Sequence, residues 1–401
     1  MECLWPRQSY DRQNERIILF SIAGAIQGNL IHPYFHYLLY RSGAQNIRPL
    51  PLINGVLCTL PDEKTVTLRA RNTFIHSVEE NSIVRLLPFF HESTNNLNNL
   101  LIKMNTVKFE KGRQLIPWGI GRIGANLAWR QSRGKEAKIA IIDTGVDFSH
   151  PDLADNVRTG INVLNPQLPA GDDHGHGTHV AGIISAVDND AGVVGIASDA
   201  ILYPVKALNL RGEGSLADVI RALDWCVEQR MDVVNMSFGI DRPSQALHTA
   251  ISRAVQAGCM VVAAAGNHGI NRTVDYPAAY NEVIAVGAAD EYDNIAWFSS
   301  RGPEVKLVAP GTKVISTSTG NSYLRLNGTS MAAAHVSGAI AILLKALKRS
   351  SKETVLKYIL KSAEVLPGFS DEEQGAGMLR VDRALSELDG KVDFRAYRHI
   401  G

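Results

Sequence analysis

Ser330 stands where a short turn meets a long apolar segment. It follows a Gly-Thr pair and precedes residues 331–347, whose composition favours a helix. Backbone N–H groups at the start of a helix point outward and favour negative charge that develops beside them. Such a position suits a catalytic nucleophile, and it equally suits an ordinary helix cap. Residues elsewhere in the chain are needed to distinguish these two interpretations.

A nucleophilic serine needs a base that takes its proton and a third group that orients the base. Asp143 ends an apolar run, residues 138–143, which predicts a buried parallel strand. Catalytic groups gather at the carboxyl ends of such strands. Asp143 is therefore a candidate orienting group, although an aspartate at a strand end can also act only as a cap or turn former.

Three closely spaced histidines, His174, His176 and His179, are candidate bases. They are also candidate metal ligands, but no acidic or cysteine partner stands at a zinc-like spacing. Asn267 ends a second apolar run, residues 260–267. Its amide can donate to an oxyanion, a task worth about 3–4 kcal/mol, although Gly-Asn alone signals only a turn.

Taken together, these motifs resemble those of the subtilisin-like serine endopeptidases, the subtilases. The matching stretches are residues 143–147, 176–182, 264–267 and 328–332, and the resemblance runs from about residue 114 to 388. It implies an α/β fold with a doubly wound, mostly parallel sheet and helices on both faces, preceded by a small α+β domain. It implies hydrolysis of peptide bonds through an acyl-enzyme.

The resemblance also assigns roles within the catalytic site. Asp143 would orient His176, which would act as general base and then as general acid. Ser330 would be the nucleophile and Asn267 the oxyanion donor. His174 and His179 would be structural or peripheral. A non-catalytic pseudoprotease would lack a member of this set, and none is missing.

The same resemblance implies a cleft that binds an extended peptide as an added strand. The residues expected to line it are Gly212, Gly214, Ser237, Phe238 and Gly239. Asp275 is expected at the base of the primary pocket, where a carboxylate would favour Lys or Arg at the cut site. The alternative is that Asp275 turns toward solvent.

A structural calcium site is a further implication of the resemblance. Calcium prefers several oxygen ligands, including backbone carbonyls, on a bendable loop. The side-chain ligands would come from Gln114, Asp152 and Asn189, and the carbonyl ligands from Val187, Ala191 and Val193. The weaker cation site of the family is in doubt because Lys306 replaces one of its acidic positions.

One departure from the family pattern lies four residues after the candidate nucleophile. Ala334 occupies a position that is usually proline. Alanine is better accommodated inside a helix and restores a backbone N–H. We expect unchanged hydrolysis; the alternative is a peptide ligase or transpeptidase, in which the acyl-enzyme yields to an amine.

The chain divides into five segments. We expect a lead at residues 1–15, a propeptide-like α+β domain at 16–87, a polar linker at 88–113, the catalytic domain at 114–389 and a tail at 390–401. The second segment resembles the inhibitory propeptide of subtilisins, which would template folding and block the cleft; the alternative is an unrelated substrate-recruiting domain. Maturation is predicted near Lys111 and Arg113.

Alternating apolar runs and helical patterns agree with this organisation. In the catalytic domain we expect strands at 201–208, 232–238, 260–267 and 283–289, and helices at 215–230, 243–257 and 330–348. In the preceding domain we expect strands at 17–21, 53–60, 74–80 and 83–87, and helices at 33–40 and 61–69.

Composition excludes several classes of function. The chain has 401 residues, 45% of them hydrophobic and 20% charged, with a net charge of +1. There is thus no electrostatic case for nucleic-acid or anionic-membrane partners, and no apolar run reaches the roughly 18 residues of a membrane span. Cys226 and Cys259 are expected to be buried thiols. Without a clear signal peptide, a cytoplasmic or non-classically exported enzyme is expected, with secretion as the alternative.

Overall fold

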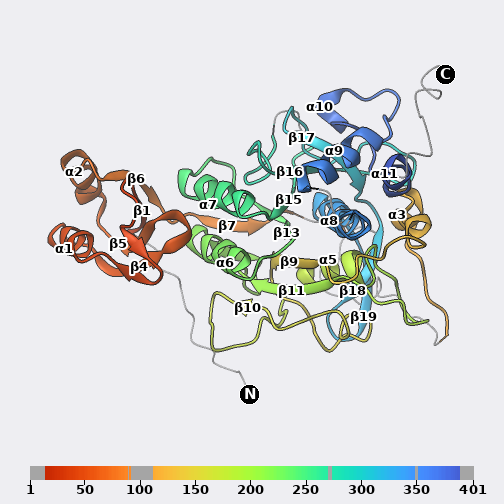
Figure 1. Ribbon diagram of the computed structural model, residues 1–401, viewed down its shortest axis with the longest axis horizontal. Helices are drawn as coiled ribbons and strands as arrows, with labels where there is room; N and C mark the ends of the chain where they lie inside the picture. Colours follow the sequence, from red (N-terminus) through yellow and green to blue (C-terminus); the bar gives the residue numbers. More distant parts are fainter. Residues whose placement is uncertain (1–13, 89, 92–111, 270–272, 348–350, 389–401) are drawn as a thin grey trace.

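The computed structural model describes residues 14–388 except 89, 92–111, 270–272 and 348–350. A small α+β domain lies beside a larger α/β domain (Figure 1). The proposed linker residues 92–111, which include Lys111, and the tail from 389 lie outside the described residues.

The small domain is built on a four-stranded antiparallel sheet. Its strand order is β4 (Gln45–Leu50), β5 (Gly55–Thr59), β1 (Glu15–Phe20) and β6 (Ile75–Glu80). The helices are α1 (Pro33–Arg41) and α2 (Asp62–Arg71), with a 3-10 turn, η1 (Pro51–Ile53), and a two-residue ribbon of β2 (Ile26–Gln27) and β3 (Leu30–Ile31).

Alternate side chains of β1 belong to two different hydrophobic cores. Ile18 packs with buried residues of α1 and α2, whereas Ile17 and Leu19 join a core that includes α6 (Leu216–Glu228) and α7 (Gln245–Gln256) of the large domain. Successive side chains of a strand point to opposite faces, so one short strand serves both cores. Figure 1 shows α1 and α2 on the side of the small sheet away from α6 and α7.

The large domain has a seven-stranded parallel sheet. Its order is β10 (Ile161–Asn162), β11 (Ile201–Lys206), β9 (Lys138–Asp143), β13 (Val233–Met236), β15 (Met260–Ala264), β16 (Ile284–Ala289) and β17 (Val305–Pro310). Ile139 and Ile141 of β9 pack with α5 (His176–Ser185) and α8 (Thr329–Ala346), whereas Ala140 and Ile142 pack with α6 and α7. The predicted α/β class with helices on both faces is confirmed.

The remaining elements surround this sheet. A hairpin is formed by β18 (Val314–Ser318) and β19 (Ser322–Asn327). Short helices complete the domain: α3 (Trp118–Arg122), α4 (Ala125–Ala128), α9 (Lys352–Ser362), α10 (Asp371–Gln374) and α11 (Val381–Leu388).

Helix α8 has the length and hydropathy of a membrane span, although the sequence showed no uninterrupted apolar run of that length. Its 18 residues are 83% buried inside the protein. Its apolar character is that of the central helix of the core. Cys226 and Cys259 are buried free thiols, as expected, and burial raises the pKa of Cys259 to about 11.

Candidate active site

Asp143 and His176 form a buried pair at the carboxyl edge of the sheet. Asp143 is the last residue of β9 and His176 the first of α5. The His176 Nδ1 lies 2.8 Å from one carboxylate oxygen of Asp143 and 3.0 Å from the other. Because an ionised carboxylate only accepts hydrogen bonds, Nδ1 carries the proton, and Nε2 of the neutral ring is the basic nitrogen.

The electrostatics of the pair favour a charged histidine. Burial lowers the pKa of His176, but the charge and hydrogen bond of Asp143 outweigh burial and raise it overall. Asp143 is also held by the backbone N–H of Thr144 at 2.8 Å. Asp143 therefore does the two things required of an orienting group: it fixes the ring and stabilises the imidazolium.

A glycine allows α5 to approach β9 this closely. A Cβ on Gly177 would lie 2.1 Å from the carbonyl oxygen of Gly145. The neighbouring histidines differ from His176. His179 is buried, its Nε2 lies 3.1 Å from the Leu324 carbonyl, and burial lowers its pKa to about 3. The His174 ring centroid lies 6.4 Å from that of His176.

Ser330 is the second residue of α8 and is fully buried. Its hydroxyl donates to the Ser237 carbonyl at 3.3 Å. Asn267 lies beside it, because its side-chain oxygen accepts from the backbone N–H of Thr329 at 3.0 Å and from the Thr329 hydroxyl at 2.9 Å. This pairing directs the Asn267 Nδ2 group, which donates to the carbonyl of Pro88 at 2.6 Å.

Pro88 belongs to a segment that fills the cleft. Strand β7 (Ile83–Leu86) is the middle strand of a three-stranded sheet, antiparallel to β12 (Glu213–Ser215) on one side and to β14 (Phe238–Gly239) on the other. The backbone N–H of Leu86 also donates to the Gly212 carbonyl at 2.8 Å. Beyond Pro88, β8 (Phe90–His91) pairs with β19. β7 and β8 therefore pair with strands of the large domain before and after Pro88, the residue whose carbonyl accepts from Asn267.

Comparison with known proteins agrees with this geometry. Residues 134–377 match the model of the subtilase family, peptidase S8. The chain belongs to the subtilase family. It is 37% identical to a thermostable alkaline protease of Halalkalibacterium halodurans over 336 residues, which cover 80% of this chain and 91% of that protein. It is 41% identical to subtilisin DY of Bacillus licheniformis over 275 residues, 68% of this chain and 99% of that protein.

A third relative, subtilisin E of Bacillus subtilis, is 45% identical over 236 residues, 58% of this chain and 61% of that protein. With such relatives, this subtilase is a subtilisin-like serine protease. The match to the alkaline protease covers more of the chain than the stretch from Gln114 to the end. It therefore extends into the residues before the predicted maturation site.

Asp275 of this subtilase lies beside the segment in the cleft and is 6% exposed, so it does not turn toward solvent. A Cβ on Gly239 would lie 2.9 Å both from the Asp275 Cβ and from a methyl carbon of Leu87. A Cβ on Gly266 would lie 2.7 Å from an Asp275 carboxylate oxygen. We call the space that holds Leu87 beside Gly239 and Asp275 the Leu87 pocket.

The partner of Asp275 is His268, which was not predicted from the sequence. His268 Nε2 lies 2.9 and 3.1 Å from the two carboxylate oxygens of Asp275. The only signal in the sequence was that His268 directly follows Asn267. Burial raises the pKa of Asp275, and His268 opposes this rise.

Most of the predicted calcium ligands lie close to one another. The side-chain amide of Gln114 lies 2.8 Å from the Val187 carbonyl, 3.2 Å from the Val193 carbonyl and 3.4 Å from the Asn189 side-chain oxygen. Asp152 is fully buried, and the Asn189 amide lies 3.4 Å from its carboxylate. The backbone N–H of Ala191 donates to the Asn189 side-chain oxygen at 3.1 Å.

This donor set fits a calcium ion. Two carbonyls and the Asn189 oxygen surround the Gln114 amide, and the Asp152 carboxylate lies against the other side-chain atom of Asn189. Rotation of the Gln114 amide would turn its oxygen toward the carbonyls and the Asn189 oxygen. Within the described residues, no three His, Cys, Asp or Glu side chains gather as a metal site. A site rich in neutral oxygens is compatible with that finding.

Residues 79–82 hold the small domain against α6 and α7. Glu79 accepts from the hydroxyl of Ser244 at 2.7 Å and from the backbone N–H of Ala246 at 3.1 Å, at the start of α7. Asn81 accepts from the backbone N–H of Ala217 at 2.9 Å, at the start of α6. The small domain therefore caps two helices of the protease domain.

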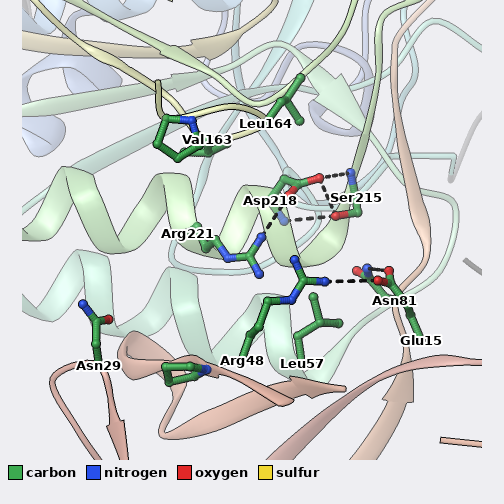
Figure 2. A pocket seen from close by; sticks show the side chains of 12 residues that line it. Glu15, Asn29, Arg48, Leu57, Asn81, Val163, Leu164, Ser215, Asp218 and Arg221 are labelled. Atoms are coloured by element: carbon green, nitrogen blue, oxygen red, sulfur yellow. Dashed lines mark hydrogen bonds and ion pairs between the residues drawn. The ribbon is translucent and has the colours of Figure 1, made fainter. Parts of the chain in front are cut away.

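A polar cavity of about 520 Å³ lies beside this interface. Figure 2 shows its two ionic groups: Arg48 pairs with Glu15 from the small domain, and Arg221 pairs with Asp218 on α6. Asp143, His176, Ser330 and Asn267 do not line it. The cavity is a feature of the interface between the domains and is separate from the catalytic residues.

Proposed function

We propose that this subtilase hydrolyses internal peptide bonds through an acyl-enzyme at Ser330. The Ser330 hydroxyl attacks the peptide carbonyl, and His176 Nε2 takes the hydroxyl proton while Asp143 stabilises the imidazolium. His176 then gives the proton to the leaving amine, and water hydrolyses the ester. The observation that carries the proposal is the 2.8 Å contact between His176 and Asp143.

Asn267 has the role of oxyanion donor in this proposal. Its amide already donates to a peptide carbonyl, that of Pro88, at 2.6 Å. A donor fixed at its other atom by Thr329 loses little energy to reorganisation when charge develops on a substrate oxygen.

We further propose that the small domain is an intramolecular inhibitor, so that the enzyme is made as a zymogen. The segment 83–91 occupies the strand positions expected of an extended peptide substrate. Its register is also unproductive. Leu87 fills the pocket, but the carbonyl at Asn267 belongs to the next residue, Pro88. In a substrate, the residue in the primary pocket supplies the attacked carbonyl.

Removal of the inhibitor is proposed near Lys111 and Arg113, as the sequence predicts. Cleavage there leaves residues 83–91 in the cleft until the small domain dissociates. N-terminal sequencing of purified active enzyme tests the position; a mature chain that begins before residue 90 contradicts it.

The proposed substrates are proteins and peptides, with Lys or Arg favoured at the cut site by Asp275. Gln114, Asp152, Val187, Asn189, Ala191 and Val193 would hold a structural calcium ion. The ion would stabilise the loop at 187–193 and would take no part in the chemistry.

The test of the catalytic proposal is covalent labelling with a fluorophosphonate. The activated enzyme should be labelled and should hydrolyse a peptide substrate, and Ser330→Ala should lose both properties. Ser337→Ala is a matched control, because Ser337 is a second buried serine of the same helix, where it donates to Asn235. Labelling that persists in Ser330→Ala contradicts the proposal.

A further inference from the structure

His268 and Asp275 form an ion pair at the wall of the Leu87 pocket. The side chain of Asp275 is 8% exposed and that of His268 is 43% exposed. The His268 backbone N–H also approaches the Ser300 hydroxyl at 3.3 Å, which fixes the start of the loop. Solvent therefore reaches the histidine, while the Asp275 side chain is buried beside the pocket.

Two glycines lie against the side chain of Asp275, and neither has a side chain to cover it. A Cβ on Gly239 or on Gly266 would come within 2.9 Å of Asp275, and the one on Gly239 would lie equally close to Leu87. The side chain that the pocket holds is apolar: Leu87 is 4% exposed and packs into the main core of the catalytic domain. A pocket built only for Lys or Arg would not be expected to accept leucine beside a carboxylate.

We propose that His268 sets the charge of the Leu87 pocket, so that the enzyme prefers an apolar residue at the cut site in acid and Lys or Arg in alkali. This inference rests on the proposed protease function. His268 is then a residue that determines specificity through Asp275, and the preference for basic residues is conditional on pH.

The physical basis is the net charge of the pair. When His268 is protonated, the imidazolium and the carboxylate sum to zero, and a cationic side chain gains little by entering. When His268 is neutral, it still donates one hydrogen bond, but the pocket keeps the negative charge of Asp275. Histidine is the side chain whose ordinary pKa, about 6.5, allows such a change near neutral pH.

Few other charges act on Asp275 within the described residues. Burial raises the pKa of Asp275, and His268 opposes this rise. The charge of Asp241, which follows β14, adds to the rise. From the segment at 299–301, the guanidinium of Arg301 pairs with Glu373 of α10 at 2.5 Å. The positive charge of Arg301 is therefore paired with Glu373. The group of this segment that contacts His268 is the hydroxyl of Ser300, which is neutral.

The experiment compares two chromogenic peptides that differ only in the residue at the cut site, arginine or leucine. The ratio of their kcat/KM values is measured with the activated enzyme from pH 5.5 to 8.5. The titration of His176 affects both substrates equally and cancels in the ratio. We expect the Arg/Leu ratio to rise at least tenfold across this range in the wild type.

Two variants separate the contributions of the pair. His268→Gln keeps a neutral donor, so its ratio should be high at every pH. Asp275→Asn removes the negative charge, so its ratio should be low at every pH. A wild-type ratio that does not change with pH overturns the inference, as does an unchanged slope in His268→Gln.

The outcome also distinguishes this inference from the proposed function. If neither peptide is hydrolysed and Ser330 is not labelled by a fluorophosphonate, the protease function itself fails. If both peptides are hydrolysed with a constant ratio, only the role of His268 is refuted.

Discussion

The contact of Glu79 with the start of α7 gives a direct measure of how firmly the inhibitor is held. Glu79→Ala removes the two hydrogen bonds that cross to the start of α7, from the Ser244 hydroxyl and the Ala246 N–H. The third hydrogen bond of the carboxylate, from the Ser77 hydroxyl, lies within the small domain and does not hold the two domains together. Hydrogen bonds to charged groups contribute about 1.5–3 kcal/mol each. Glu79 is half-buried, so solvent screening reduces that contribution. We therefore expect the closed form to lose about 2 kcal/mol in total.

A loss of about 2 kcal/mol corresponds to a roughly 30-fold larger open population. The assay is the rate at which a fluorophosphonate labels Ser330 in the full uncleaved chain, because the reagent reaches Ser330 only after the segment leaves the cleft. When the segment leaves and re-enters the cleft faster than the reagent reacts, the labelling rate is proportional to the population of the open form. Glu79→Ala should be labelled about 30 times faster than the wild type.

Glu80→Ala is the matched control, since Glu80 is the next residue of β6 and is exposed. It should be labelled at the wild-type rate. Equal labelling rates in the two variants would refute the argument that capping of α7 holds the inhibitor in place. Circular dichroism of both variants checks that the domains remain folded.

Three further predictions concern catalysis, calcium and pH. Asn267→Ala should lower kcat about 10²–10³-fold, the loss measured in a subtilisin on removal of its oxyanion amide; an unchanged kcat rejects this role. In a Ser330→Ala background that prevents self-digestion, a chelator should lower the melting temperature, and Asp152→Asn should remove this sensitivity; a melting temperature indifferent to chelator argues against bound calcium. Burial under η1 and the nearby Glu228 raise the pKa of Asp224 to about 6, against an opposing hydrogen bond from Leu52. The folded state then binds the proton more tightly than the unfolded state, whose carboxyl titrates near 3.9, so stability falls as pH rises from about 4 to 6. Asp224→Asn should therefore raise the melting temperature more at pH 7 than at pH 4, and equal shifts at both values would contradict it.

Much of the fold could be predicted from local patterns in the sequence. The expected helix at 33–40 is α1 (Pro33–Arg41), and the expected strand at 283–289 is β16 (Ile284–Ala289). Both elements have a regular apolar period and clear ends. By contrast, β4 (Gln45–Leu50) was missed, because only Leu50 in it is buried and Pro49 interrupts its pattern. An edge strand tolerates such a sequence, since one side of it has no ladder partner.

The candidate catalytic residues could be proposed from the sequence because each lies in a local motif, whereas the environment of the Leu87 pocket could not. The extended character of β7 was predicted, but its position between β12 and β14 depends on residues about 130 and 150 positions away. No local pattern encodes such a pairing. For the same reason, Asp275 was predicted as a pocket carboxylate with no partner named, and its contact with His268 is seen only in the folded structure.

If the small domain is the inhibitor proposed above, the position of β7 also determines how inhibition depends on concentration. While the small domain is covalently attached, its segment competes for the cleft at an effective concentration that is typically millimolar for a short flexible tether. Free substrate at micromolar levels cannot displace it efficiently. Once the connecting chain is cut, the same segment becomes a separate molecule whose occupancy falls on dilution. Cleavage thus leaves every contact of β7 unchanged and makes the inhibition reversible by dilution, so a newly cut enzyme should be most active where it is scarce.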